Sequence, residues 1–456
     1  MTSMKGVRLG VSDNGRSLTA NGAPWLYVAD TAWTLFKRLN RDEVEIYLTN
    51  RAAKGFSVIQ AYVLRGLEVQ NRDGRLPLVD RDPTRLDEGF FGNIDWIVNR
   101  ANELGLAMGL VATQGEHVKK KVNAERFKDR DEQIFNKDNA FTFGANLGRR
   151  YRDNAVVWLL GGDRSPSAED VVVWDAIARG MKQGSDGRHL VSYHSSGAHS
   201  SSEYFHQFDW LDLNTVQSRH GSGDPNYEYI ATDYSLTPVK PTLDMECRYE
   251  DHPDGALGNL REIMAGMVEP TARVDAFSAR QAGYWATFAG AAGHGYGHNS
   301  IWQLHDPANP VDSRKDYSFP LLPPTKSWRE AMDDEGAFGI GHLATLLHAR
   351  PWHETFPDRA LVRSMQGPGE DRTLGLTARD GSFAMIYLSY GNPVRIDTDR
   401  IRGDHVVSRW FDPRTGRFSG PEAVHEHGLH DFTAPSSGRG NDWVLVLEGS
   451  KRGFDR

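Results

Sequence analysis

Two carboxylates, Asp163 and Glu246, have the residue type and the setting that could do chemistry. Asp163 follows the apolar run 155–160 and two glycines, and Glu246 ends the segment 239–246. The short apolar run 155–160 predicts a strand buried on both faces, and 239–246 is predicted as another strand of the same sheet, so each carboxylate is expected at the carboxyl end of a strand. Two facing carboxyl groups, one protonated and one ionised, could hydrolyse a glycosidic bond. The alternative is that each acid only caps a helix or pairs with a neighbouring arginine.

The elements that must position these carboxylates alternate between strand and helix patterns. Such alternation is the signature of a parallel barrel whose strand carboxyl ends form the active-site face. We therefore predict an α/β fold, a (β/α)8 TIM barrel over residues 1–352 with an N-terminal hairpin over 7–24. The predicted strands are 25–29, 56–63, 106–111, 155–160, 188–194, 211–218, 239–246 and 295–303, and the main helices are 94–104, 139–151, 168–181, 275–292 and 328–348.

The pattern changes after Pro351. Short alternating runs such as 382–388, 406–411 and 443–447 are separated by turn signals such as Asp380-Gly381. Runs of this kind predict a small antiparallel β-sandwich domain over residues 353–456.

Further polar and aromatic residues lie at or just past the predicted strand ends. The polar side chains could hold sugar hydroxyls and the two tryptophans could stack on a ring, although local loop structure is the alternative for each. The predicted loops 66–93 and 114–137 are expected to set the specificity, because long loops often carry function. The candidates for substrate binding are Asp30, Trp33, Gln60, Arg164, His194, Gln217, Arg248, His298 and Trp302.

No metal site and no cofactor is predicted. His294 and His298 are four residues apart, but the glycines around them argue against the helix that would bring them together. Side chains alternate along a strand, so Asp244 and Glu246 are expected to point the same way. Cys247 should then face away from Glu246 as a buried, inert thiol.

Length, charge and cysteine content limit the partners and the location that can be expected for this protein. The chain has 456 residues, a formal net charge of −8 and one cysteine. The negative charge argues against nucleic acid or an anionic membrane as partner, and one cysteine excludes an intrachain disulfide. We find no signal-peptide pattern and no apolar run long enough for a membrane span, so a cytoplasmic location is predicted. No sequence signal sets an oligomeric state.

Several segments together resemble the apiosidase-like glycoside hydrolases, from about Leu9 to Leu447. The resemblance implies a (β/α)8 barrel joined to a C-terminal β-sandwich labelled as collagen-binding. It also implies a retaining mechanism, with Asp163 as general acid/base and Glu246 as nucleophile, and a terminal apiose or related furanose of a plant glycan as the sugar released. The segments are Asp30–Trp33, Gly55–Gln60, Leu159–Arg164, Tyr193-His194, Asp244–Glu250 and Gly297–Gln303.

We therefore predict a retaining glycoside hydrolase that acts on small carbohydrate or glycoside substrates and needs no cofactor. A non-catalytic carbohydrate-binding protein on a barrel scaffold is one alternative, because a fold does not fix a function. A sugar isomerase or lyase is the other. It would require a metal cage or a lysine at a strand end, and a divalent ion between His194, His298 and Glu246 would favour it.

Overall fold

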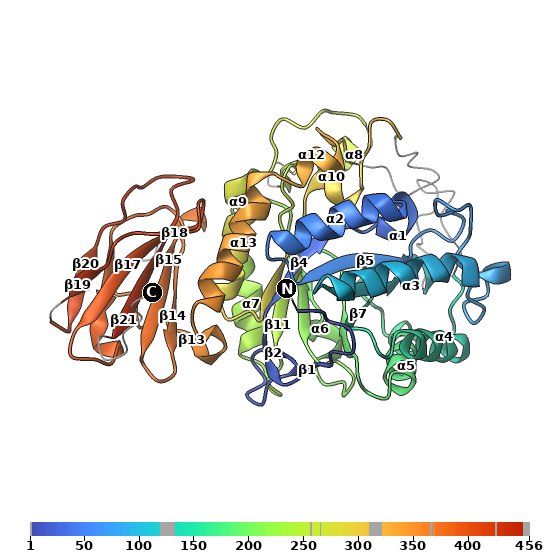
Figure 1. Ribbon diagram of the computed structural model, residues 1–456, viewed down its shortest axis with the longest axis horizontal. Coiled ribbons are helices and arrows are strands. Elements are labelled where there is room, and N and C mark those ends of the chain that lie inside the picture. Colours follow the sequence, from blue (N-terminus) through green and yellow to red (C-terminus); the bar gives the residue numbers. More distant parts are fainter. Residues whose placement is uncertain are drawn as a thin grey trace.

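A curved sheet of parallel strands forms the centre of the larger part of the molecule (Figure 1). This computed structural model describes residues 2–118, 133–255, 258–264, 266–309, 322–364, 367, 369–424 and 426–449. The sheet has the order β8-β7-β6-β5-β4-β12-β11-β10-β9, in which only the short β9 runs antiparallel. Its strands are β4 (Tyr27–Thr31), β5 (Val58–Leu64), β6 (Ala107–Thr113), β7 (Val156–Leu160), β8 (Leu190–Tyr193), β9 (His199–Ser200), β10 (Asn214–Gln217), β11 (Thr242–Glu246) and β12 (Gly293–Tyr296).

The barrel closes between β8 and β10 through a mixture of backbone and side-chain hydrogen bonds. The backbone N–H of Asp212 donates to the Val191 carbonyl at 3.0 Å. The hydroxyl of Ser192 donates to the Leu213 carbonyl at 2.8 Å, and that of Thr215 donates to the Tyr193 carbonyl at 2.6 Å. Eight parallel strands with helices around them make the predicted (β/α)8 fold, so this prediction is confirmed.

Several of the barrel helices begin where the local sequence supplies a side-chain cap, namely α2, α3, α4, α9 and α12. In α2, for example, the Asn40 side chain accepts a hydrogen bond from the Glu43 backbone N–H, and the Glu43 carboxylate accepts one from that of Asn40. This reciprocal capping satisfies two of the backbone groups that a helix start leaves open. The main barrel helices are α2 (Arg41–Ala53), α3 (Glu88–Glu103), α4 (Lys137–Arg150), α5 (Val171–Gly184), α7 (Asn226–Tyr234), α9 (Ala276–Phe288), α12 (Trp328–Ala331) and α13 (Glu335–His348).

The prediction of strand eight over 295–303 is wrong in its bounds. The strand β12 ends at Tyr296, and Asn299–Trp302 form a short helix, α10. The imidazole Nδ1 of His298 accepts a hydrogen bond from the Ser300 backbone N–H at 3.0 Å and so caps this helix. The predicted closing helix over 328–348 is also divided, into α12 and α13.

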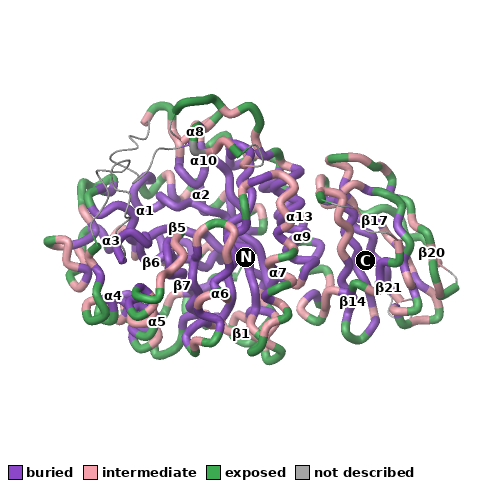
Figure 2. Tube along the Cα trace, turned by 180° about the vertical axis from the view of Figure 1, so that it is seen from behind, coloured by how far each residue is buried: buried purple, intermediate pink, exposed green. Residues whose placement is uncertain are grey.

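The apolar core has two layers around the strands. Figure 2 shows that the strands at the centre of the molecule are buried. Inside the barrel, Tyr27, Val58, Val111 and Met245 pack together, and residues of the N-terminal segment join them. That segment forms three antiparallel strands, β1 (Leu9–Val11), β2 (Leu18–Ala20) and β3 (Ala23–Trp25), where a hairpin was predicted. The second layer lies between the strands and the helices.

The C-terminal part consists of two antiparallel sheets that enclose their own apolar cluster. The larger sheet has the order β13-β14-β15-β21-β17-β18, with β19 on β17, and the smaller one pairs β16 with β20. The strands are β13 (Thr355–Pro357), β14 (Thr373–Ala378), β15 (Phe383–Leu388), β16 (Val394–Asp397), β17 (Val406–Asp412), β18 (Arg417–Phe418), β19 (Glu422–Val424), β20 (Leu429–Phe432) and β21 (Trp443–Gly449).

A buried ion pair joins the sandwich to the barrel. The Arg280 guanidinium of α9 donates two hydrogen bonds to the Asp442 carboxylate, at 3.0 and 2.6 Å, and the Tyr387 hydroxyl donates a third at 3.1 Å. Around them, apolar residues of α9, β14 and β15 belong to one continuous cluster with the barrel helices. The two parts therefore share a core.

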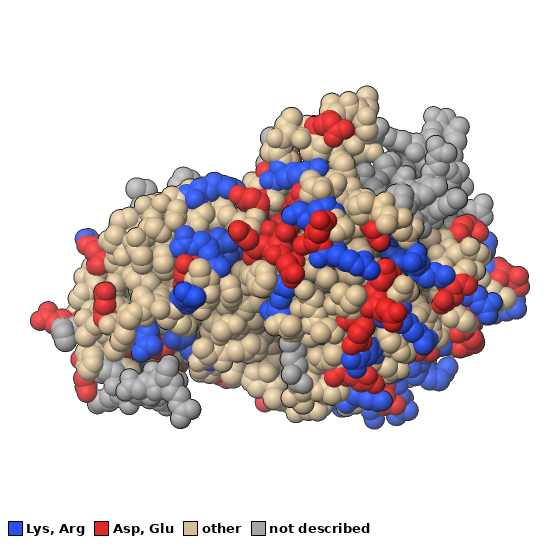
Figure 3. Space-filling model, turned by 45° about the horizontal axis from the view of Figure 1, so that its top comes forward, with Lys and Arg blue, Asp and Glu red and all other residues tan. Residues whose placement is uncertain are grey.

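Many of the charged residues lie on the surface in mixed groups (Figure 3). On the face shown in Figure 3, acidic and basic side chains are interleaved. Arg150, for example, pairs with both Glu88 and Asp95 at 2.9 and 2.8 Å. Within the described part of the chain, no helix has the length and apolar character needed to cross a membrane.

Replacing Asp442 should destabilise the whole chain. The change Asp442→Ala leaves the Arg280 guanidinium buried without its carboxylate, which typically costs about 3–5 kcal/mol. Urea unfolding of the variant and the wild type measures the difference. The control Arg395→Ala removes an exposed pair with Asp431 and should leave the unfolding midpoint nearly unchanged. Equal midpoints for wild type and Asp442→Ala would contradict the importance of the buried pair.

Candidate active site

A cavity of about 300 Å³ lies at the carboxyl ends of the barrel strands. Both predicted catalytic carboxylates, Asp163 after β7 and Glu246 at the end of β11, line it. Aromatic and charged side chains make up much of the remaining wall. They are Trp33, Tyr62, Tyr249, Trp302, Arg65, Glu116 and Arg164.

A β-bulge brings Glu246 to the cavity. In the ladder with β10, Val216 faces Asp244 but Gln217 faces Glu246, so Met245 is the extra residue of β11. The Met245 carbonyl accepts a hydrogen bond from the Gln60 amide at 3.0 Å. The prediction that Asp244 and Glu246 point the same way is wrong, because the bulge breaks the alternation. Asp244 instead bonds to Ser218 and Asn226, away from the cavity.

Two histidines hold the Glu246 carboxylate. The His194 Nε2 lies 2.8 Å from Oε2, and the His220 Nε2 lies 3.5 Å from Oε1. Burial alone would raise the pKa of Glu246, but these hydrogen bonds and charges outweigh it and hold the pKa below its usual range. Glu246 is therefore ionised at neutral pH.

The second ring nitrogen of His194 shows which charge the ring carries. Its Nδ1 lies 2.9 Å from the Ser195 carbonyl oxygen, which can only accept, so Nδ1 bears a hydrogen. Beside an ionised Glu246, Nε2 must donate as well, which makes the ring an imidazolium. Burial would lower the pKa of His194, but the bond to Glu246 outweighs this effect and the pKa is raised.

The Gly161-Gly162-Asp163 turn sets the position of the second carboxylate. All three residues have positive φ, at 86°, 53° and 62°. A Cβ on Gly161 would lie 2.2 Å from the His194 carbonyl oxygen, and one on Gly162 would lie 2.2 Å from that of Thr113. Only glycine fits at either position. The same turn holds Asp163, which is not a glycine, in the left-handed region. Strained residues of this kind are common at active sites.

The environment keeps Asp163 more protonated than an ordinary aspartate. Asp163 is exposed to solvent, but it lines the cavity, and protein groups surround its carboxyl group there. Burial raises the pKa of Asp163, and the negative charge of Glu246 raises it further. The two carboxyl groups thus have pKa values that are shifted in opposite directions.

Five of the predicted substrate-binding residues lie at the cavity or directly beside Glu246. Trp33, Arg164, Gln217 and Trp302 line the wall. Arg164 forms an ion pair with Glu116, and the Oε1 of Gln217 has no hydrogen-bond partner among the described residues. His194 lies behind Glu246, with its ring 5.6 Å from that of Trp33.

The structure does not bring the other four to the cavity wall. Asp30 is buried against Tyr47 and Arg51 at 2.6 and 3.4 Å, beneath α2. Gln60 bonds to Tyr27, Thr31 and Met245 below the cavity, and His298 caps α10 and bonds to Asp334. Arg248 lies under α9, where it bonds to Gln281 and stacks on Trp285. The hydrogen bonds and ion pairs of these four residues indicate a structural role within the barrel.

Several cavity residues were not predicted. His220 lies three residues past the end of β10, and its ring stacks on that of His252 with a centroid distance of 4.7 Å. Tyr249 and His252 follow Glu246 by three and six residues. Searching a few residues beyond each predicted strand end would have found all three. Residues 119–132 of the predicted specificity loop 114–137 lie outside the described residues.

Comparison with known proteins identifies the family. The family described as "Apiosidase-like, catalytic domain" matches residues 12–354, and the one described as "Putative collagen-binding domain of a collagenase" matches residues 356–448. No curated protein sequence matches the chain.

Solved structures agree with this match. One described as a glycoside hydrolase is 26% identical, with a TM-score of 0.86 over 99% of each chain. A glycoside hydrolase family 5 structure from Bacteroides vulgatus is 27% identical, with a TM-score of 0.86 over 98% of this chain and 94% of its own. A family 5 mannosidase from Rhizomucor miehei, 13% identical over 75% and 98% with a TM-score of 0.53, shares the fold. The chain belongs to the apiosidase-like glycoside hydrolases and is a glycosidase.

Proposed function

We propose that this glycosidase is a retaining enzyme in which Glu246 is the nucleophile and Asp163 the general acid/base. The observation that carries the proposal is that Asp163 and Glu246 line one cavity while two histidines hold the Glu246 carboxylate, and the opposite directions of the two pKa shifts agree with it. A pair of carboxyl groups with separated pKa values is the arrangement from which acid and base roles are assigned. Glu246, held ionised by two histidines, suits attack on the anomeric carbon.

The reaction would proceed in two steps. The Glu246 carboxylate bonds to the anomeric carbon while Asp163 gives its proton to the leaving oxygen, so the glycosidic bond breaks and a glycosyl-enzyme forms. Asp163, now ionised, takes a proton from water as the water oxygen bonds to the anomeric carbon. The bond from this carbon to Glu246 then breaks, which frees the carboxylate and releases the sugar with its original configuration. His194 keeps its protons and remains the charge partner of Glu246.

We propose that the sugar released is a terminal apiose or a related furanose from plant-derived glycosides or oligosaccharides. The family match supports this sugar. A cavity of about 300 Å³ is at the lower end of the range of ligand sites, which suits a small terminal sugar. Trp33 and Trp302 offer faces for stacking. Action on imported glycosides in the cytoplasm stays a prediction.

The variant Glu246→Ala should lose at least about 10³-fold in kcat, as expected when a covalent nucleophile is removed. Sodium azide should restore part of the turnover of aryl furanosides and give a glycosyl azide of inverted configuration, because azide enters the space left by the carboxylate. NMR of the product determines its configuration. An azide product of retained configuration would assign the nucleophile elsewhere, and a substrate panel that includes pyranosides tests the sugar.

The variant Asp163→Ala should discriminate between leaving groups. An aryl glycoside with an acidic phenol needs little protonation, so its hydrolysis should slow far less than that of an alkyl glycoside, where about 10²–10⁴-fold is expected for loss of general acid catalysis. Measuring kcat/KM for both substrates checks this. Equal losses on the two substrates would contradict the acid/base role.

Removing the imidazolium should move the acid limb of the pH profile. In His194→Gln the carboxylate of Glu246 loses a positive partner, so the pKa of Glu246 rises. As the pH is lowered, kcat/KM should therefore begin to fall earlier, with the midpoint of the acid limb at least about one pH unit higher than in the wild type. The alkaline limb reports the Asp163 pKa and should move less. The control His353→Gln changes a histidine outside the cavity and should reproduce the wild-type profile. An unmoved acid limb in His194→Gln would contradict the role of this bond.

A further inference from the structure

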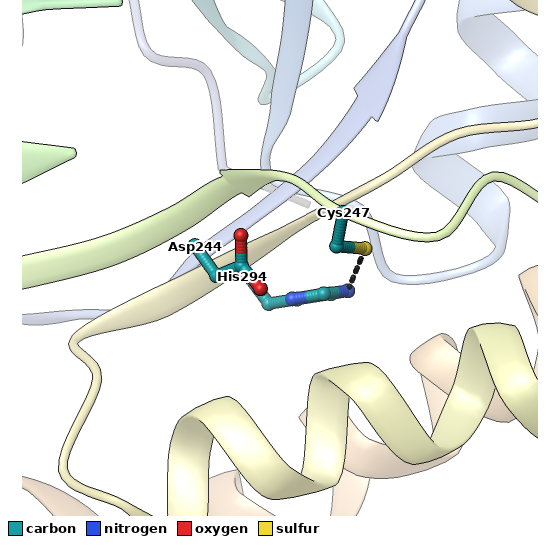
Figure 4. Close-up of side chains that lie close together, drawn as sticks. All are labelled: Asp244, Cys247 and His294. Atoms are coloured by element: carbon teal, nitrogen blue, oxygen red, sulfur yellow. Dashed lines mark hydrogen bonds between the residues drawn. The ribbon is translucent and has the colours of Figure 1, made fainter. Parts of the chain in front are cut away.

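Three potential metal ligands meet on the far side of β11 from the cavity. Asp244 lies on β11, His294 lies opposite it on β12, and Cys247 follows the end of β11. One ligand atom of each residue lies within 4.8 Å of the other two, and all three side chains are buried. Figure 4 shows the carboxylate, the thiol and the imidazole converging between the two strands and a neighbouring helix.

The closest pair already has the spacing of two ligands on one ion. The Cys247 Sγ lies 3.5 Å from the His294 Nε2. With Zn–S and Zn–N bonds of about 2.3 and 2.0–2.1 Å at the tetrahedral angle, these atoms would be about 3.6 Å apart. The Gly295 carbonyl oxygen, 3.4 Å from Sγ, is a further oxygen atom that could serve as a metal ligand at the same place.

The third ligand has an unused oxygen. Asp244 is fully buried, and its Oδ2 accepts hydrogen bonds from Ser218 and Asn226 at 3.0 and 2.8 Å. Its Oδ1 has no hydrogen-bond partner among the described residues. A buried carboxylate oxygen without a partner is costly and requires an explanation. A cation between Oδ1, the thiol and the imidazole supplies one.

We propose that Asp244, Cys247 and His294 bind one thiophilic divalent transition-metal ion, such as Zn²⁺, in a structural site between β11 and β12. Thiolate, imidazole and carboxylate together form a ligand set that such ions prefer. The site lies two residues from Glu246 on one side and one residue on the other, so the ion would fix the part of β11 that carries the nucleophile.

Charge and protonation are compatible with this site. Burial lowers the pKa of His294 to about 3, so its ring is neutral and keeps a lone pair for the metal. Burial raises the pKa of the Cys247 thiol, so the ion must displace its proton to solvent on binding, and the ionised thiol and carboxylate then balance the two charges of the ion. The nearby Arg248 guanidinium is occupied by Gln281, Asn226 and the Asp224 carbonyl.

The single cysteine makes the test specific. Protein without a histidine tag is unfolded, freed of metal by a chelator, refolded with Co²⁺ and passed through a gel-filtration column. We expect about one equivalent of Co²⁺ by elemental analysis, together with a thiolate-to-metal charge-transfer band in the near ultraviolet. Since the chain contains one cysteine, such a band reports Cys247. The same protein refolded with Zn²⁺ should retain about one equivalent and lack the band.

Variants separate the ligands from the background. Cys247→Ser should abolish the band and lower Co²⁺ retention at least about tenfold, and His294→Ala should do the same, while His353→Gln should match the wild type. Should a ligand variant fail to refold, the wild-type protein alone decides. Folded wild type that retains less than about a tenth of an equivalent and shows no band would overturn the proposal and leave a hydrogen-bonded cluster.

Discussion

The hydrogen bond between the buried imidazole of His194 and Glu246 is the interaction on which the cavity depends. Without it, burial would raise the pKa of Glu246, and the two carboxyl groups would compete for protons on similar terms. The imidazolium removes this symmetry, because it favours charge on Glu246 alone. The charge on Glu246 then raises the pKa of Asp163, so one interaction supports both protonation states. The Ser195 carbonyl supports this set of interactions, because it accepts a hydrogen bond from the His194 Nδ1 and so keeps a proton there.

Two departures from regular backbone bring these groups together. The bulge at Met245 turns the end of β11, so that Glu246 enters the cavity although Asp244 faces the helices. The turn after β7 uses three successive left-handed residues, and two of them pass so close to neighbouring carbonyl groups that a side chain has no room. Regular strands would have carried both carboxylates past the cavity or turned them outward. The barrel provides the rigid framework, and these two irregularities orient the carboxylates toward the cavity.

Much of the fold could be predicted because it rests on apolar runs and breaks in them. The strand of 155–160 and the switch to short alternating strands after Pro351 are visible in the sequence. The direction in which a side chain points cannot be read from the sequence in the same way. Asp30 and Glu246 both stand at strand ends, yet one meets Arg51 under a helix and the other meets the cavity. A one-residue bulge carries no composition signal, so Glu246 could be predicted at the carboxyl end of its strand, but the different direction of Asp244 could not. The helix α10 was missed because its cap is a histidine, an uncommon residue for that position.

Helix α9 has consequences for how this chain can be divided. All its residues from Phe277 to Phe288 are buried, since the barrel covers one side and the sandwich strands β14 and β15 cover the other. A barrel cut away from its sandwich would expose this helix together with an arginine that has lost its acid. The two regions therefore share one core, although two separate family models match them. A chain truncated to the catalytic barrel alone would therefore have an incomplete core.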